Sequence, residues 1–256
     1  MLRKGDLTQG GITGTLLHFT LPMLVGSFLQ QCYNIADTLI VGQCIGAGAL
    51  AAVGSAYTLM VFLISVLLGL AMGSGTVFSL HYGAGNHVAL RRSIFSSFVL
   101  IGIVTLILNV AVFIWLDPIL RLLQVPQDIY GMMRSYLWII FCGIVFTFIY
   151  NFYASLLRAV GDSVTPLWFL AVSVVLNIAL DLFFILQLDW GIQGAAAATV
   201  LAQGVAALGI IIYTYRRRPE LRWHHEDMCF DRTCLKEIAS FSTLTCIQQS
   251  VMNLGI

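Results

Sequence analysis

Apolar residues dominate the chain in long runs, which are separated by short clusters of charged residues, glycine and proline. A helix that spans a bilayer needs about 20 predominantly apolar residues. Six runs reach that length, and we expect a spanning helix in each of them: 15–42, 52–80, 94–116, 135–157, 165–187 and 192–214. A seventh run begins near Ile238 and continues to residue 256, where it looks cut short, so we expect the start of a further helix.

The composition agrees with an all-α integral membrane protein. The 256 residues are 59% hydrophobic and only 10% charged, whereas a soluble domain carries roughly 25% charged residues. Twenty-three glycines suit helices that pack closely in a bilayer. A net charge of +1 does not favour a nucleic-acid partner. The expected partner is therefore the lipid bilayer.

Lysine and arginine predict the orientation, because these residues favour the cytoplasmic side of spanning helices. With the N-terminus in the cytoplasm, the outer segments hold only Arg121 and Arg134. The inner segments hold the other eleven: Arg3, Lys4, Arg91, Arg92, Arg158, Arg216, Arg217, Arg218, Arg222, Arg232 and Lys236. We therefore predict a multi-pass protein of the plasma (inner) membrane whose N-terminus is cytoplasmic.

This orientation also divides the chain into three parts. Residues 1–215 form a six-helix lobe, 216–237 a cytoplasmic loop, and 238–256 the truncated start of a second lobe. The loop contains His224, His225, Cys229 and Cys234. Their spacing matches no zinc-ligand pattern, so we interpret them as ordinary loop residues.

Two acids lie well inside predicted spans, where a carboxylate is costly unless it is compensated. Asp37 belongs to the first span and Asp181 to the fifth. Either acid could instead mark a misplaced helix end. Against this, amide side chains recur on the same helical faces, at the three- and four-residue offsets that stack side chains. These residues are Gln30 and Asn34 before Asp37, and Asn177 before Asp181.

The sixth span contributes polar groups at a matching depth. Thr199 and Gln203 are four residues apart and follow the small-residue start "GIQGAAAAT", which permits a close neighbour. Counting from the helix ends at 1.5 Å per residue, Asp37, Asp181 and Thr199 all lie roughly 10–12 Å below the outer surface. We therefore expect three helices to meet in one polar layer.

Two carboxyl groups in such a layer can do one of two things. They can share a proton at neutral pH, because two close like charges cannot both ionise easily. Alternatively, carboxylate and amide oxygens can surround a hard cation such as Na⁺. Both states describe a coupling-ion site, which is a common role for intramembrane acids. Pro22 interrupts the hydrogen bonding of the first span, either as a static kink or as a hinge.

Several segments resemble the multidrug and toxic compound extrusion (MATE) family of transporters, in the same order. They are "PMLVGSFLQQCYNIADTLIVGQCIGAGALAAVG", "LLRAVGDSVTP", "LNIALD" and "GIQGAAAAT". The resemblance implies twelve helices in two six-helix lobes, with export of organic cations and drugs against H⁺ or Na⁺. It implies a coupling-ion site at Asp37, Asn177, Asp181 and Thr199, with a bending proline at Pro22. The second lobe beyond its first helix is missing.

We therefore expect the amino-terminal lobe of a secondary active multidrug exporter that works without a cofactor. Gln30, Tyr33, Asn34 and Gln203 are expected to face its substrate cavity. The alternative within transport is a lipid-linked oligosaccharide flippase of the same superfamily, which would favour a cationic cavity, whereas the predicted spans hold no internal Lys or Arg. A membrane enzyme is the other alternative, but no catalytic motif appears at membrane depth.

Overall fold

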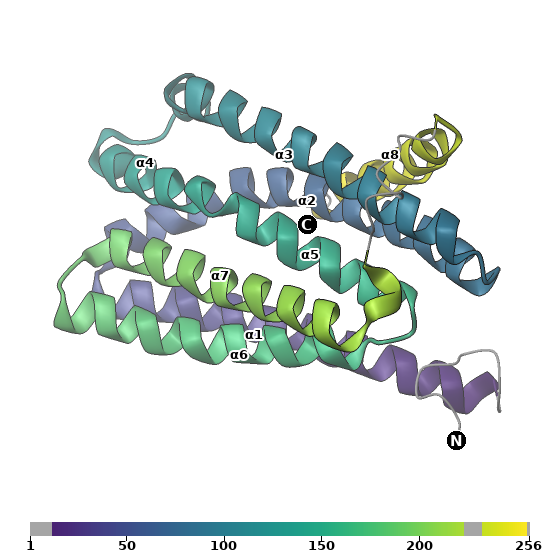
Figure 1. The fold of residues 1–256 in the computed structure, drawn as a ribbon. Helices are drawn as coiled ribbons and strands as arrows, with labels where there is room; N and C mark the ends of the chain where they lie inside the picture. Colours follow the sequence, from purple (N-terminus) through teal and green to yellow (C-terminus); the bar gives the residue numbers. More distant parts are fainter. Residues whose placement is uncertain (1–11, 223–231, 255–256) are drawn as a thin grey trace.

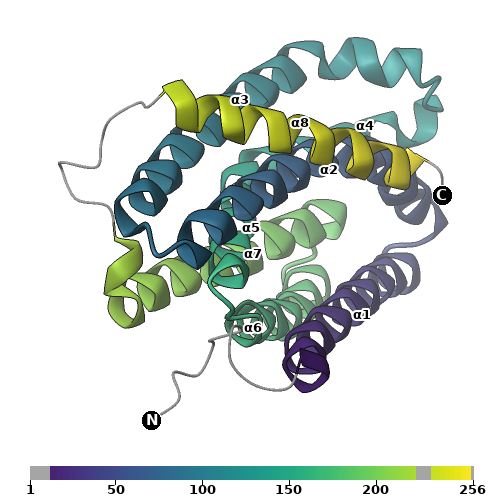
Figure 2. The same ribbon diagram turned by 90° about the vertical axis from the view of Figure 1, so that its right-hand side faces the viewer.

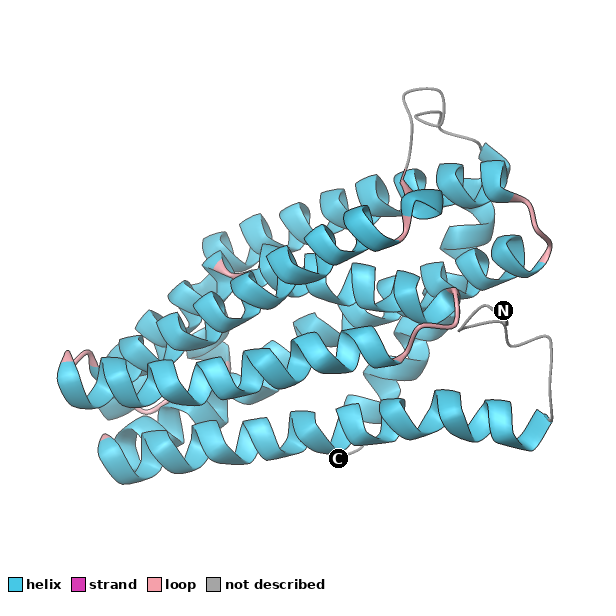
Figure 3. Cartoon of the chain, turned by 60° about the horizontal axis from the view of Figure 1, so that its bottom comes forward, coloured by secondary structure: helices cyan, strands magenta, loops and turns pink. Residues whose placement is uncertain are grey.

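A computed structural model describes residues 12–222 and 232–254 of the chain. Within these ranges the protein is helical and has no strand, and short loops join successive helices (Figures 1 and 3). The elements are α1 (Ile12–Cys44), α2 (Ala47–Gly83), α3 (His87–Leu122), α4 (Gln127–Cys142), α5 (Ile144–Ala159), α6 (Val164–Leu182), the π-helical turn η1 (Phe183–Gln187), α7 (Gly191–Arg217), the 3₁₀ turn η2 (Pro219–Leu221) and α8 (Arg232–Leu254).

Most of the predicted spans correspond to strongly apolar helices. Among the described residues, α2, α3, α7 and the segment Val164–Gln187 are each long and apolar enough to cross a membrane. The helices α4 and α5 form one more such segment, bent by 47°. Although α1 lies outside this set, its 33 residues would extend ~50 Å. Large apolar side chains, among them Ile107, Ile114 and Trp115 of α3, are exposed on the bundle surface, as expected for a lipid-facing helix.

The span predicted over 135–157 is bent, because the helix is interrupted at Gly143 between α4 and α5. A Cβ atom at Gly143 would lie only 2.4 Å from a methyl carbon of Val200 in α7. The missing side chain lets α7 pack against the bend. The break was not visible as a hydrophobic pattern, because apolar residues continue through it on both sides.

The helices pack around α2 and α7 (Figure 1). Five helices contact α2, namely α1, α3, α4, α5 and α8, while α7 packs against α4, α5 and α6. The peripheral helix α1 packs mainly against α6. Successive spans alternate in direction, with α4 and α5 together counting as one bent span, so one end of the bundle collects most of the arginines. We call it the arginine end; its described members are Arg91, Arg92, Arg158, Arg216, Arg217, Arg218 and Arg222.

The last helix differs from its predicted position. We expected a loop to residue 237, but α8 already begins at Arg232. Cys234 is therefore a buried helix residue, and its sulfur lies 2.7 Å from the Ser93 hydroxyl oxygen of α3. The other three loop residues considered above as metal ligands, His224, His225 and Cys229, lie outside the described residues.

Small residues bring α8 against α2 over much of its length (Figure 2). A Cβ atom at Gly73 would lie 2.4 Å from the Cα atom of Ser242, and one at Gly69 would lie 2.5 Å from the Cα atom of Cys246. The Ser242 hydroxyl donates to the Leu70 carbonyl at 3.4 Å. This spacing of glycines, one helical turn apart, is the usual device for close helix contact in membranes.

We predict that Gly73→Val separates α8 from α2. The new side chain would meet backbone atoms, which cannot move without shifting the helix, and overpacking of this kind costs about 1–3 kcal/mol. We expect a maleimide to alkylate Cys246 about tenfold faster in this variant. Mass spectrometry of the peptide that contains Cys246 measures the rate.

Gly54→Val is the matched control, because it places the same side chain in the same helix where no atom lies within 4 Å. Equal alkylation rates of Cys246 in both variants would show that the glycine contact does not hold α8 in place.

Candidate functional site

The two intramembrane acids meet inside the bundle. Asp37 of α1 is 8% exposed and Asp181 of α6 is fully buried. Their carboxyl groups lie close enough to interact with each other. Two ionised carboxylates at such close range repel each other, and a proton shared between them would remove the repulsion. The arrangement is a buried pair of acids contributed by two helices.

Asn177 and Thr199 connect the acid pair to α7. Asn177 is fully buried one turn before Asp181. When its amide nitrogen donates to Asp181 Oδ2 at 3.0 Å, its oxygen accepts from the Thr199 hydroxyl at 3.3 Å and from the Thr199 backbone N–H at 3.2 Å. This orientation satisfies both ends of the amide, which is the criterion that decides between the two possible orientations.

Tyr33 closes the connection from α7 back to α1. Its hydroxyl donates to Thr199 Oγ1 at 3.2 Å, and it lies one turn before Asp37 on the same helical face. Side chains from α1, α6 and α7 thus meet in one polar cluster of Tyr33, Asp37, Asn177, Asp181 and Thr199. The sequence placed Asp37, Asp181 and Thr199 at one depth and Asn177 on the helical face of Asp181. Tyr33 was instead expected to face the substrate cavity, and it does not line the hollow described below.

One neighbour of the cluster escaped the sequence reasoning. Tyr136 of α4 is 3% exposed and interacts electrostatically with Asp37, Tyr33 and Asp181. We placed it at the edge of a predicted span that started at residue 135. Since α4 begins at Gln127, Tyr136 instead lies ~14 Å along the helix. A lone tyrosine among apolar residues was the only available signal.

Each acid of the pair has an oxygen atom that is available to bind a proton or a cation. The Oδ1 atoms of Asp37 and Asp181 are buried and have no hydrogen-bond partner in the described part of the chain. Together with the amide and hydroxyl oxygens, they form the kind of oxygen donor set that accepts a proton or a hard monovalent cation. No group of three or more His, Cys, Asp or Glu side chains that could hold a metal ion occurs among the described residues.

A small hollow adjoins the cluster at Thr199. It lies between α2, α4, α5 and α7, and its lining residues are Met60, Ile64, Ile140, Phe141, Ile144, Thr147, Thr199, Val200 and Gln203. The Thr147 hydroxyl is hydrogen-bonded to Gln203 Oε1 across it. Gln203 therefore lines this hollow, and its place in a substrate cavity stays a prediction. The lining is mostly apolar, with Thr147, Thr199 and Gln203 as its polar residues.

The other predicted cavity residues lie on α1. Asn34 is partly buried and its backbone carbonyl accepts from the Thr38 hydroxyl at 2.7 Å, whereas Gln30 is exposed. Neither lines the hollow beside Thr199. Pro22 lies within the continuous helix α1, fifteen residues before Asp37. In this structure α1 is not split into two helices at that proline.

The fold and the cluster define a class: helical, multi-pass membrane proteins with a buried acid pair. Comparison with known proteins specifies it further. The MatE family pattern matches residues 22–183, so the chain belongs to the MatE family, whose members are transporters rather than enzymes.

Relatives and solved structures agree with this assignment. The chain is 36% identical over 217 residues to "Probable multidrug resistance protein YpnP" of Bacillus subtilis (strain 168), with 85% of this chain and 49% of the relative covered. It is 31% identical over 210 residues to "Multidrug export protein MepA" of Staphylococcus saprophyticus, with 79% and 45% covered. The chain thus spans about half the length of these curated relatives.

One solved structure matches nearly the whole chain. It is described as the outward-facing conformation of a multidrug resistance MATE family transporter of the MOP superfamily. The TM-score is 0.91 at 24% identity, with 99% of this chain and 56% of the other covered. At this identity the match establishes the fold. It confirms the expected all-α fold.

We predict that Thr199→Val destabilises the cluster by about 1–3 kcal/mol, because it leaves buried polar groups of Tyr33 and Asn177 without their shared partner. Thermal unfolding in detergent should show a clear drop in melting temperature.

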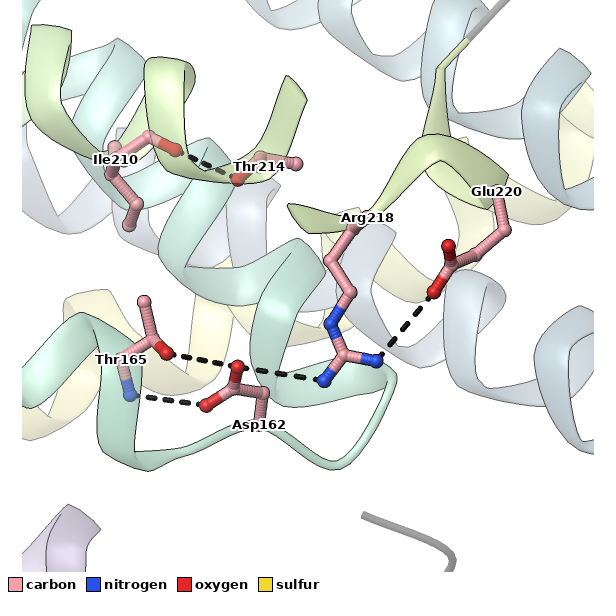
Figure 4. A network of polar contacts seen from close by, with 6 residues as sticks. All are labelled: Asp162, Thr165, Ile210, Thr214, Arg218 and Glu220. Carbon is pink, nitrogen blue, oxygen red and sulfur yellow. Dashed lines mark hydrogen bonds and ion pairs between the residues drawn. The ribbon is translucent and has the colours of Figure 1, made fainter. Parts of the chain in front are cut away.

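The matched control is Thr214→Val on the same helix, whose hydroxyl donates only to the Ile210 carbonyl one turn earlier (Figure 4). Equal drops for both variants would mean that the Thr199 hydroxyl does not join the three helices.

Proposed function

We propose that the chain is the amino-terminal lobe of a secondary active multidrug exporter, which moves organic cations and other drugs against H⁺ or Na⁺. The observation that carries the proposal is the closely spaced, buried pair of Asp37 and Asp181. A pair of acids at membrane depth is costly to the fold. Such a pair is retained where binding and release of a cation is useful.

The names of the relatives support drugs as the substrate class, since two of them are described as a multidrug resistance and a multidrug export protein. Net negative charge from the acid pair would favour a cationic substrate over an anionic one. Among the described residues, no Lys or Arg contacts the acid pair. The site therefore does not favour a flippase, which would need positive charge to hold a phosphate group.

Exchange follows from competition for the acid pair. When one carboxyl group is ionised, it attracts a cationic substrate or Na⁺; when the pair is neutralised, that attraction is lost and the substrate leaves. The pair connects α1 to α6 and, through Tyr33 and Thr199, to α7. A change of its charge therefore acts directly on how α1 packs. We propose that α1 bends at Pro22, where the backbone lacks one hydrogen bond.

Alternating access would require a second lobe, which we place after α8 in agreement with the length of the relatives.

We propose that the arginine end faces the cytoplasm and that the membrane is the plasma membrane. A cysteine introduced at Arg217 would then react with an impermeant thiol reagent only after the membrane is opened; labelling in intact cells would invert the orientation.

In a full-length transporter that contains this chain, we predict that Asp37→Asn and Asp181→Asn each reduce export of a fluorescent cationic drug to the background level. Neutralising either acid removes the charge on which exchange depends, and it also removes a burial penalty, so membrane insertion should be preserved. Efflux from loaded cells, normalised to the amount of transporter in the membrane, measures this.

Asp117→Asn is the control variant. This acid lies near the C-terminal end of α3, where it pairs with Arg134 at 2.8 Å, and it is outside the cluster. Its loss should leave export largely intact. Normal export by the Asp37→Asn protein would contradict the proposed coupling role, and failure of that protein to insert would make the acid structural.

A further inference from the structure

The helix α2 has one side chain that can become charged near neutral pH. Its 37 residues include no Asp, Glu, Lys or Arg, and His81 in the last turn is its only histidine. The first two turns of α8 contain Glu237, which is the only acid of that helix. The Nε2 atom of His81 lies 3.6 Å from the Oε2 atom of Glu237. At the arginine end, the two helices thus place one histidine beside one acid.

The position of His81 favours this contact when the imidazole is protonated. Its Nε2 atom is buried and has no hydrogen-bond partner in the described part of the chain. Protonation makes both ring nitrogens donors, and a charged donor binds a carboxylate more strongly than a neutral one. The C-terminal end of a helix also stabilises positive charge. The cationic form of His81 would therefore draw the Glu237 carboxylate towards α2.

The rest of the contact between α2 and α8 is uncharged. Within the described residues, α8 packs mainly against α2 and also against α3 (Figure 2). Small residues meet along α2, and two hydrogen bonds that cross this interface come from Ser242 and Cys246 and end on backbone carbonyls. None of these groups on α2 changes its charge near neutral pH. His81 and Glu237 therefore supply the charge-dependent part of the interface.

Other charges at this end do not reproduce the contact. In the helices packed against α2, the other described titratable or charged residues at the arginine end are His87, Arg91 and Arg92 of α3, Tyr153 and Arg158 of α5, and Cys234 and Lys236 of α8. The described parts of α1 and α4 add none there. The acids Asp162 and Glu220 both pair with Arg218, each at 3.5 Å. Glu237 is thus the acid available to attract a histidine cation.

We propose that His81 and Glu237 form a pH-dependent clamp that fastens the start of α8 to α2. A histidine changes its charge between pH 5 and 8, whereas a glutamate side chain stays ionised over most of this range. The attraction is therefore present near pH 6 and is lost as the pH rises to 8. The clamp makes the packing of α8 respond to the pH at the arginine end, and it does not depend on the proposed transport function.

The test measures alkylation of Cys234 by a maleimide in the purified 256-residue chain in detergent. Cys234 lies three residues before Glu237 and is 6% exposed, so it reacts when the start of α8 moves away from the bundle. At pH 6, it should react about threefold faster in His81→Gln and in Glu237→Gln than in the wild-type chain, as expected for loss of a partly exposed ion pair. At pH 8, the three rates should be equal. Comparing the chains at one pH cancels the pH dependence of the thiol reaction.

The two variants separate the clamp from a direct effect of charge on the thiol. Loss of a positive charge and loss of a negative charge would change the reactivity of Cys234 in opposite directions, whereas loss of the clamp accelerates the reaction in both variants. His87→Gln is the matched control, because His87 is exposed at the start of α3 and its ring contacts Tyr82 of α2. It should leave the rate at Cys234 unchanged at both pH values.

Cys32, which is partly buried in α1, reports on the whole bundle in the same digests and should keep its rate. Four results would each overturn the proposal. They are the same acceleration by His81→Gln at pH 6 and pH 8, opposite effects of His81→Gln and Glu237→Gln, equal effects of His81→Gln and His87→Gln, and acceleration of Cys32 together with Cys234.

Discussion

Two carboxyl groups inside a membrane protein cannot both be charged and unpaired, and the packing of this chain follows from that constraint. Desolvating a single charge costs several kcal/mol. Asp37 and Asp181 meet the constraint by lying beside each other, where they can share a proton, while Asn177 donates to Asp181. Three helices must therefore lie close together at one depth, which requires α1 to pack on α6 and α6 on α7.

Small residues make this closeness possible. The start of α7 is rich in glycine and alanine, and a Cβ atom at Gly194 would lie 3.0 Å from the Cβ atom of Phe184 in η1. Gly143 permits a similar approach between the α4–α5 bend and α7. Since Thr199 also lies on α7, tight packing of this helix keeps the hydroxyl within reach of Tyr33 and Asn177. The polar cluster and the glycine contacts are thus parts of one arrangement.

The cluster was largely predictable because its members obey simple geometry. Asp37 and Tyr33 are one turn apart, as are Asp181 and Asn177, and the depth of Thr199 follows from counting residues along a helix. Tyr136 was missed because a start at residue 135 hid the first turns of α4. The bend at Gly143 and the early start of α8 at Arg232 depend on contacts with Val200 and with α2 and α3, which no local pattern reveals.

The central claim is that Asp37 and Asp181 form one titrating unit. Infrared difference spectroscopy of the carboxyl stretch, recorded across pH on the wild-type chain and on each single Asp→Asn variant, tests it most directly. The account predicts that Asp37 protonates over a different pH range once Asp181 is replaced, because interacting sites titrate as a pair. Titration of Asp37 that is unchanged by Asp181→Asn would show two independent acids and would contradict the account.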